Sequence, residues 1–309
     1  MLNLRGINFF IPFYATDMTT IQTGTPKVLF PADLSDSCMT AWETAKAFAK
    51  TYNAEVVILY VLEEPAFKLV TEYNSEVEVV RARKRLSDFI AEKELEKEIA
   101  VSGVVKIGKP YKKIQEAAME MNPIWIVMGT HGAEGMQELL IGSNASKVVR
   151  SAPCPCITVR HNPVEVDFNS IILPLDLTKE SKEKISQAVD IAHKFNAEIH
   201  LVSNYHHNSD VVGLLEKQME VAAKFIEDRG VKVTTKIFES NRHYGDAILE
   251  YTADVHGDMI CIMAQQDKSL REYFVGTEAE HIVNRSPVPV ISIRPMTIFV
   301  AKADGSIFG

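Results

Sequence analysis

A glycine-rich stretch near the middle of the chain has the composition of an anion-binding loop. Gly129 and Gly132 follow an apolar run, and Gly142 with Ser143 precedes a segment with helical spacing that runs through Arg150. Glycines let backbone amides approach an anion without a Cβ in the way, and the first amides of a helix are unpaired at its positive end. The pattern therefore predicts a polyphosphate-binding loop. The hydroxyl of Ser143 has two open roles, capping the helix or contacting a phosphate.

Spacing excludes the two best-known phosphate cradles. The segment from Gly142 to Lys147 lacks the Gly-Lys-Ser/Thr ending of a P-loop, and the segment from Gly129 to Gly135 does not match the dinucleotide pattern Gly-x-Gly-x-x-Gly. Any single glycine here is explained by a simple turn after a strand. The combination of several glycines with a helix start favours a ligand.

Composition narrows the class of protein. The 33 basic and 41 acidic residues give a net charge of -8, which argues against a broad contact with nucleic acid or an anionic membrane. The sequence shows neither a long uninterrupted apolar run nor the order of segments typical of a secretory signal. The 4 cysteines are too few for a disulfide framework. We therefore expect a cytoplasmic protein without disulfides.

The chain contains an internal repeat with a period of about half its length. Residues 27–35 correspond to residues 170–178, each an apolar run followed by Pro, Asp and a hydroxyl residue. Residues 151–160 correspond in the same way to residues 286–294. Between them, apolar runs alternate with amphipathic segments, which is typical of a parallel sheet covered by helices on both faces. The sequence predicts an α/β protein with two tandem doubly wound domains, each with a five-stranded parallel sheet flanked by helices.

Hydrophobic periodicity places the elements and the boundaries. We expect an N-terminal extension over 1–25, domain 1 over 26–161, domain 2 over 168–295 and a C-terminal extension over 296–309. The extensions are either extra strands that cover a sheet edge or floppy tails. First strands, each ending in a loop, are expected within 27–35 and 170–178, and last strands within 151–160 and 286–294. The strands between them are expected at 56–62, 101–106, 124–128, 199–203, 231–238 and 259–263, and helices at 40–52, 76–97, 143–150, 182–195 and 214–229.

The glycine loop also carries a family resemblance. Its pattern Gly-x2-Gly-x9-Gly-Ser, followed by Ser-Ala-Pro-Cys-Pro, resembles the ATP-binding signature of the universal stress protein family, and both halves share the family's Pro-x-Asp opening. The resemblance covers about residues 26–160 and 168–295. It implies Rossmann-like domains whose last strands pair in an intramolecular pseudo-dimer, with a further homodimer left open. It also implies adenine and ribose near the ends of the first two strands, with the phosphates over the glycine loop, at Pro31, Asp33, Val61, Met128, Gly129, His131, Gly132, Gly142, Ser143 and Asn144.

Three of these residues have a structural alternative. Asp33 either accepts hydrogen bonds from ribose or adenine, or caps the helix that follows Ser35. Val61 is either an apolar wall of the site or a core residue. His131 is a loop residue packed on the ligand or a neighbouring turn rather than a general base, so we assign no catalytic residue.

The second half lacks the signature. In the loop that corresponds to the glycine loop, two of the three glycines are replaced, while Asp267 and Glu278 introduce negative charge where phosphates would lie. We expect one ATP per chain and a mainly structural second domain. An uncharged or cationic ligand there is left open.

Other candidate chemistry is weak. Cys154 and Cys156 are separated by a single residue and lack a second ligand pair, so they do not predict a zinc site. The histidine pairs His206 with His207 and His243 with His256 would need folding to assemble a site, and we assign no metal. The basic run at residues 81–85 lies among glutamates, which is typical of a salt-bridged helix face.

The resulting hypothesis is an intracellular ATP-binding module, with or without Mg²⁺, that regulates a stress response through an unknown protein partner or its own assembly. A slow ATP hydrolase and a ligand-free interaction protein are the alternatives. The sequence offers neither a strong general base nor a clear pair of Mg²⁺-binding carboxylates, which disfavours hydrolysis.

Overall fold

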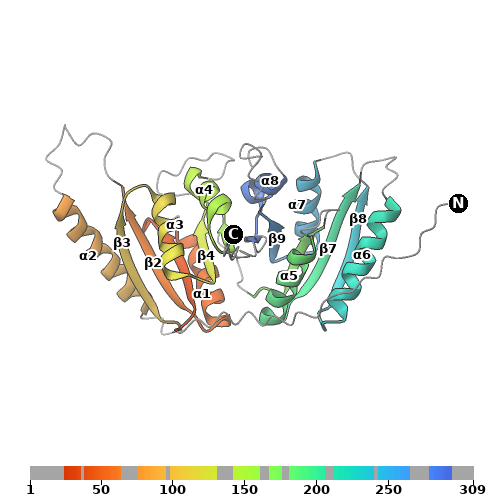
Figure 1. Cartoon of the computed structure of the whole chain (residues 1–309), viewed down its shortest axis with the longest axis horizontal. Coiled ribbons are helices and arrows are strands. Elements are labelled where there is room, and N and C mark those ends of the chain that lie inside the picture. Colours follow the sequence, from red (N-terminus) through yellow and green to blue (C-terminus); the bar gives the residue numbers. More distant parts are fainter. Residues whose placement is uncertain are drawn as a thin grey trace, which may run out of the picture.

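The computed structural model shows one wide sheet with helices on both faces (Figure 1). The predicted α/β class is confirmed. The structure describes residues 24–35, 38–63, 75–94, 98–130, 142–160, 167–175, 181–205, 212–239, 243–264 and 278–293. The predicted C-terminal extension lies outside these residues, as does the N-terminal one except for residues 24 and 25.

Domain 1 forms the left half of Figure 1. Its strands are β1 (Lys27–Ala32), β2 (Glu55–Leu62), β3 (Val101–Ile107), β4 (Trp125–Gly129) and β5 (Cys156–Val159). Its helices are the 3-10 helix η1 (Cys38–Ala41), α1 (Trp42–Thr51), α2 (Ser75–Glu94), α3 (Pro110–Met121) and α4 (Ser143–Ser151).

Domain 2 repeats this order in the right half of the figure. Its strands are β6 (Ser170–Pro174), β7 (Glu198–Tyr205), β8 (Val233–Glu239), β9 (Met259–Met263) and β10 (Val290–Ile293). Its helices are α5 (Ser181–Phe195), α6 (Val212–Glu227), α7 (Tyr244–Asp254) and α8 (Glu278–Arg285).

The strands follow the order β3-β2-β1-β4-β5-β10-β9-β6-β7-β8 in a 10-stranded sheet. Neighbours within each domain are parallel, as predicted. Where the domains meet, β5 and β10 pair antiparallel, with Ile157 opposite Ile291. The pairing of last strands implied by the family resemblance is therefore present, and it joins the two five-stranded sheets into one.

Apolar residues explain why the sheet is covered on both sides. The central residues of β2, from Val56 to Leu59, are all buried, which is expected of a strand with helices on each face. One core lies beneath α1, α2, α5 and α6, and the other beneath α3, α4, α7 and α8. Each core contains residues of both domains, so the domains share their hydrophobic interior.

An aromatic cluster ties the domains together at the first of these cores. Phe48 of α1 lies 4.8 Å from Phe195 of α5 and 5.6 Å from Phe168, measured between ring centroids. Trp125 and Tyr52 extend the cluster on the side of domain 1. These contacts pack the two domains against each other.

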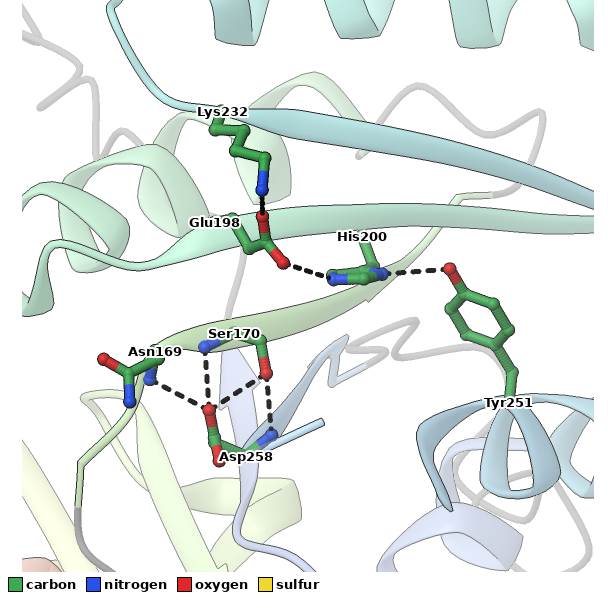
Figure 2. Close-up of polar contacts among 7 residues, drawn as sticks. All are labelled: Asn169, Ser170, Glu198, His200, Lys232, Tyr251 and Asp258. Carbon is green, nitrogen blue, oxygen red and sulfur yellow. Dashed lines mark hydrogen bonds and ion pairs between the residues drawn. The ribbon is translucent and has the colours of Figure 1, made fainter. Parts of the chain in front are cut away.

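Domain 2 has an additional polar clasp at the amino ends of its central strands (Figure 2). One oxygen of Asp258 accepts hydrogen bonds from the amides of Asn169 and Ser170 and from the Ser170 hydroxyl, each at 2.9 Å. The clasp fixes the start of β6 to the start of β9. In domain 1 the corresponding residues are Pro26, Lys27 and Ile124, which cannot form it.

Helices α3 and α7 were not predicted from the sequence. Each connects the third strand of its domain to the fourth and packs on the second core. None of the helices in the described part of the chain is long and apolar enough to span a membrane. All 4 cysteines are free thiols.

Candidate functional site

The winding direction of domain 1 changes between β1 and β4. Strand β1 pairs with β2 on one side and with β4 on the other, and the connections that leave the carboxyl ends of β1 and β4 run to opposite faces of the sheet, to α1 and to α4. Open α/β sheets bind ligands at such switch points. The structure brings most of the predicted site residues to this end of the sheet, namely Pro31, Asp33, Val61, Met128, Gly129, Gly142, Ser143 and Asn144.

The ends of the glycine loop are closed on each other. The amide of Gly142 donates to the carbonyl of Thr130 at 2.8 Å, and the amide of Thr130 donates to Val159 at 3.0 Å. A Cβ on Gly142 would stand 2.7 Å from the Thr130 oxygen, closer than packing allows. Gly142 is therefore required for loop closure. The predicted residues His131 and Gly132 lie in the intervening part of the loop, outside the described residues.

Helix α4 begins at this closed loop. Gly142 is its N-cap residue and makes no side-chain cap, and Ser143 is the first helical residue. The prediction that Ser143 caps the helix is wrong, because Ser143 lies one residue inside the helix. The first turn carries no acidic side chain. The unpaired first amides of α4 thus keep their partial positive charge, which suits an anion.

Asp33 shapes the loop that follows β1. Its carboxylate accepts hydrogen bonds from the amide of Ser35 at 3.1 Å and from the Ser35 hydroxyl at 2.6 Å. The intervening Leu34 has a φ of 60°, a left-handed conformation that is strained for leucine and tends to occur at functional sites. The alternative in which Asp33 caps a helix is wrong, because η1 begins only at Cys38. Asp33 instead stabilises an exposed turn.

The negative charge of Asp33 also acts on Cys38. Burial, together with the nearby carboxylate, raises the pKa of the Cys38 thiol to about 11. The thiol therefore stays protonated at neutral pH, which makes Cys38 a structural neighbour of Asp33 rather than a nucleophile.

The apolar members of the predicted set belong largely to the core. Met128 is 6% exposed, and Val61 packs against the same core beneath α3 and α4. Pro31 is partly buried and pairs with Leu59 of β2. The side chains of Met128 and Val61 belong to the core, so polar contacts from this part of the sheet would come from the main chain.

The equivalent edge of domain 2 is arranged differently. Strand register equates β1 with β6 and β4 with β9, which places Glu278 of α8 where domain 1 has Asn144. The Glu278 carboxylate accepts a hydrogen bond from the amide of Gly245 at 2.6 Å and lies 2.8 Å from Nδ1 of His243. A protein carboxylate thus lies at the first turns of both α7 and α8, where a phosphate would otherwise be favoured.

Side chains also bind the main-chain carbonyls at this edge of domain 2. Tyr244 donates to Val202 at 3.1 Å, Ser203 donates to Leu175 at 2.6 Å, and the buried ammonium of Lys184 donates to the carbonyl of Pro174. Sequence reasoning missed these three residues. A lysine within the apolar face of α5 is the signal that could have identified Lys184. The predicted Asp176 and Asp267 lie outside the described residues.

The histidines of domain 2 form a pair that was not predicted. His243 stacks on His281 with ring centroids 4.5 Å apart, and His281 contacts Asp246 at 2.6 Å. His256 lies beyond the other end of α7, which separates it from His243 by the length of the helix. The pairing of His243 with His256 considered above is therefore wrong. Among the described residues, no group of His, Cys, Asp and Glu is arranged to hold a metal ion.

The basic run in α2 is a salt-bridged surface, as predicted. A guanidinium nitrogen of Arg81 lies 2.6 Å from a carboxylate oxygen of Glu78, one turn earlier in the helix. Both side chains are largely exposed to solvent. No aromatic residue lies among the basic residues 81–85, so the run lacks the stacking side chains typical of nucleic-acid binding.

Comparison with known proteins gives one family for both halves. The family model for the Universal stress protein family matches residues 24–160 and 167–294. A universal stress protein of Methanocaldococcus jannaschii is 32% identical over 145 residues, covering 43% of this chain and 81% of that protein. A universal stress protein of Thermus aquaticus is 33% identical over 139 residues, which cover 43% of this chain and 97% of that protein.

One solved structure shares the fold over most of the chain. A universal stress protein from Archaeoglobus fulgidus is 23% identical, covers 87% of this chain and 96% of its own, and has a TM-score of 0.71. A second protein from that organism, solved in complex with dAMP, is 15% identical over 41% of this chain with a TM-score of 0.35.

Proposed function

Since this chain belongs to the universal stress protein family, we propose that domain 1 binds one ATP per chain and that domain 2 binds no nucleotide. The observation that carries the proposal is the start of α4. There a closed glycine loop delivers unpaired helix amides, without an acidic side chain in the first turn, to the switch point between β1 and β4.

The proposed roles follow from position. The amides of Ser143 and Asn144, with the Ser143 hydroxyl, bind the phosphates, joined by Gly129, His131 and Gly132 of the loop. Gly142 positions the start of α4 through its amide bond to Thr130. Asp33 accepts a hydrogen bond from the ribose. Backbone groups near Pro31, Val61 and Met128 contact the adenine. Mg²⁺ accompanies the nucleotide as its counterion where it is present.

We place this module in the cytoplasm as a regulator of a stress response. Four free thiols support a reducing compartment. ATP occupancy would be read by a protein partner, or by a second copy of the chain. The domains are taken as residues 26–161 and 168–295, with extensions at 1–25 and 296–309; the family match supports these limits to within a few residues.

Calorimetric titration with ATP tests the proposal. We expect one site per chain, and we expect Asn144→Glu, which imports the carboxylate of domain 2, to weaken binding by at least about tenfold through repulsion of the phosphates. Asn144→Gln is the neutral control and keeps the affinity. Glu278→Gln leaves the stoichiometry at one.

The result that would overturn the proposal is the absence of binding at millimolar ATP, or two equivalent sites. Mass spectrometry of the denatured purified protein gives an independent reading, because a bound nucleotide would be released. Steady phosphate release that disappears in His131→Ala would instead favour the hydrolase.

A further inference from the structure

Strand β8 ends the sheet on the side of domain 2, and no strand in the described part of the chain pairs with its outer edge (Figure 1). Such an edge is a template for an added strand. Grooves flank β8 on both faces. One, the α7 groove, lies between β8 and α7, and the other, the α6 groove, lies between β8 and α6.

The α7 groove has an aromatic floor and an acidic rim. Phe238 and Tyr251 pack edge to face with ring centroids 5.5 Å apart. Glu250 and Asp254 of α7 lie beside them, against the single cation Lys236 among the residues that line this groove. Aromatic faces together with carboxylates are the surroundings that bind guanidinium and ammonium groups.

A polar network behind the groove holds Tyr251 in place (Figure 2). The Tyr251 hydroxyl lies 2.9 Å from Nδ1 of His200, whose Nε2 lies 3.1 Å from Glu198. Glu198 in turn pairs with Lys232. His200 is 8% exposed, so the network fixes the ring from inside the domain. Burial, with the charge of Glu198, raises the pKa of Tyr251 and keeps its ring a neutral phenol.

The same place in domain 1 is closed by ion pairs. Lys106 of β3 pairs with Glu120 of α3 at 2.6 Å, and Lys113 pairs with Glu116 at 2.6 Å. Strand register equates Lys106 with Phe238.

The helices correspond as well. The left-handed residues Asn122 and His256 that follow α3 and α7 align the two helices. This equates Lys113 with Ala247, while Glu116 and Glu120 correspond to Glu250 and Asp254. Domain 2 has therefore kept both acids and replaced both lysines.

The α6 groove is acidic as well. Val233, Thr235 and Ile237 of β8 face it, and α6 together with the residue that follows it contributes Glu216, Glu220, Glu227 and Asp228 against Lys224. An added strand would point alternate side chains into the two grooves. Both faces of the edge thus select positive charge.

We propose that the β8 edge binds an extended segment of a partner protein that carries arginine or lysine side chains. The main chain of the segment adds to β8, and basic side chains enter the α7 groove over Tyr251 and Phe238 and the α6 groove on the other face. The proposal is independent of nucleotide binding in domain 1.

Fluorescence anisotropy of the full chain with a labelled peptide of the repeat Arg-Arg-Thr-Thr, which presents arginine on both faces of an added strand, tests this docking. Phe238→Lys restores the domain 1 arrangement by placing an ammonium beside Asp254, and we expect binding to weaken by about tenfold. Asp254→Lys, on the exposed face of α7, should have the same effect if the first variant folds poorly. Ile107→Lys on β3 adds the same charge in domain 1 and should leave affinity unchanged.

Hydrogen exchange separates strand addition from simple charge attraction. The peptide should protect amides within residues 233–239. Equal affinity in all variants, equal binding of a glutamate–threonine peptide, or protection only elsewhere would overturn the proposal. Self-association of the chain in sedimentation velocity that Phe238→Lys abolishes would also overturn it, since the occupant would then be a second copy.

Discussion

Domains 1 and 2 share a fold but differ in the first turn of the helix that follows their fourth strand, which is α4 in domain 1 and α8 in domain 2. In domain 1, α4 begins with Ser143 and Asn144, and its first turn has no acid. In domain 2, Glu278 occupies the corresponding place and accepts the Gly245 amide. A helix start can be satisfied by an anionic ligand or by the protein's own carboxylate. The comparison indicates that a glutamate at this position satisfies the helix start without a bound anion.

The largest effect is expected from breaking the shared aromatic core. Phe48→Ala should lower the free energy of unfolding by about 3–5 kcal/mol, because Phe48 is fully buried and contacts Phe168 and Phe195 of domain 2. Calorimetry should show both domains unfolding together at a lower temperature. Leu214→Ala, at a side chain 55% exposed on α6, should change stability by less than about 0.5 kcal/mol. Separate transitions for the two domains would show that their cores are independent.

Closing of the glycine loop is the next test. Gly142→Ala should destabilise the chain by about 1–3 kcal/mol, because its methyl group would overlap the carbonyl of Thr130. ATP affinity should fall with it. Gly213→Ala is the matched control, since a Cβ there meets nothing within 4 Å and the substitution should be neutral or stabilising by up to about 1 kcal/mol. Unchanged urea unfolding of Gly142→Ala would contradict the closed geometry.

Removing the carboxylate from domain 2 should have a smaller effect. Glu278→Gln should cost about 1 kcal/mol, because it weakens the hydrogen bond to Gly245 and the contact with His243 at a partly exposed site. Equilibrium unfolding in urea measures it. Glu220→Gln, an exposed residue of α6, is the control and should be silent. If Glu278→Gln raised the stability of domain 2, the negative charge of Glu278 would destabilise the fold and would not replace a bound anion.

The smallest effect is a pH dependence in domain 2. Lys232, and then His200, hold the pKa of Glu198 below its ordinary value of 4.5. The stabilisation by Glu198 is therefore fully present above pH 4.5 and is lost as the pH falls through the lower pKa of the folded state. The free energy of unfolding of the wild type should exceed that of Glu198→Gln by up to about 1 kcal/mol at neutral pH. In acid the two free energies should converge.

Domain 1 provides the control for this pH dependence. Glu55 lies 3.7 Å from Lys27, and Glu55→Gln, in the same urea series, should change the free energy of unfolding by less than about 0.5 kcal/mol at neutral pH. A constant difference for Glu198→Gln across the acid range would mean that its carboxylate contributes through packing alone.

Much of this architecture was predictable because its signals are local. Apolar runs identified the strands, and the repeated Pro-x-Asp opening identified the two halves. Helix α3 was missed although Pro110 at its first position and the spacing of Ile114, Ala117 and Ala118 are helix signals. The sequence alone also predicted that Gly142 lies at the start of α4 and Glu278 near the start of α8.

The remaining features depend on contacts between distant segments. Tyr251 meets His200 only because α7 packs across β7, and Lys184 reaches the carbonyl of Pro174 only once α5 covers β6. Neither spacing nor composition encodes such distances. The same holds for the closure of Gly142 on Thr130, which looks in the sequence like one more flexible glycine.

The antiparallel pairing of β5 with β10 takes place within one polypeptide, and this fixes the ratio of the two domains. Because both strands belong to one polypeptide, their encounter is unimolecular, and dilution cannot separate them as it would separate two subunits. Domains 1 and 2 are therefore always present in equal number, and each last strand has its partner at a high effective concentration. A chain of this kind carries its asymmetry permanently, whatever its concentration in the cell.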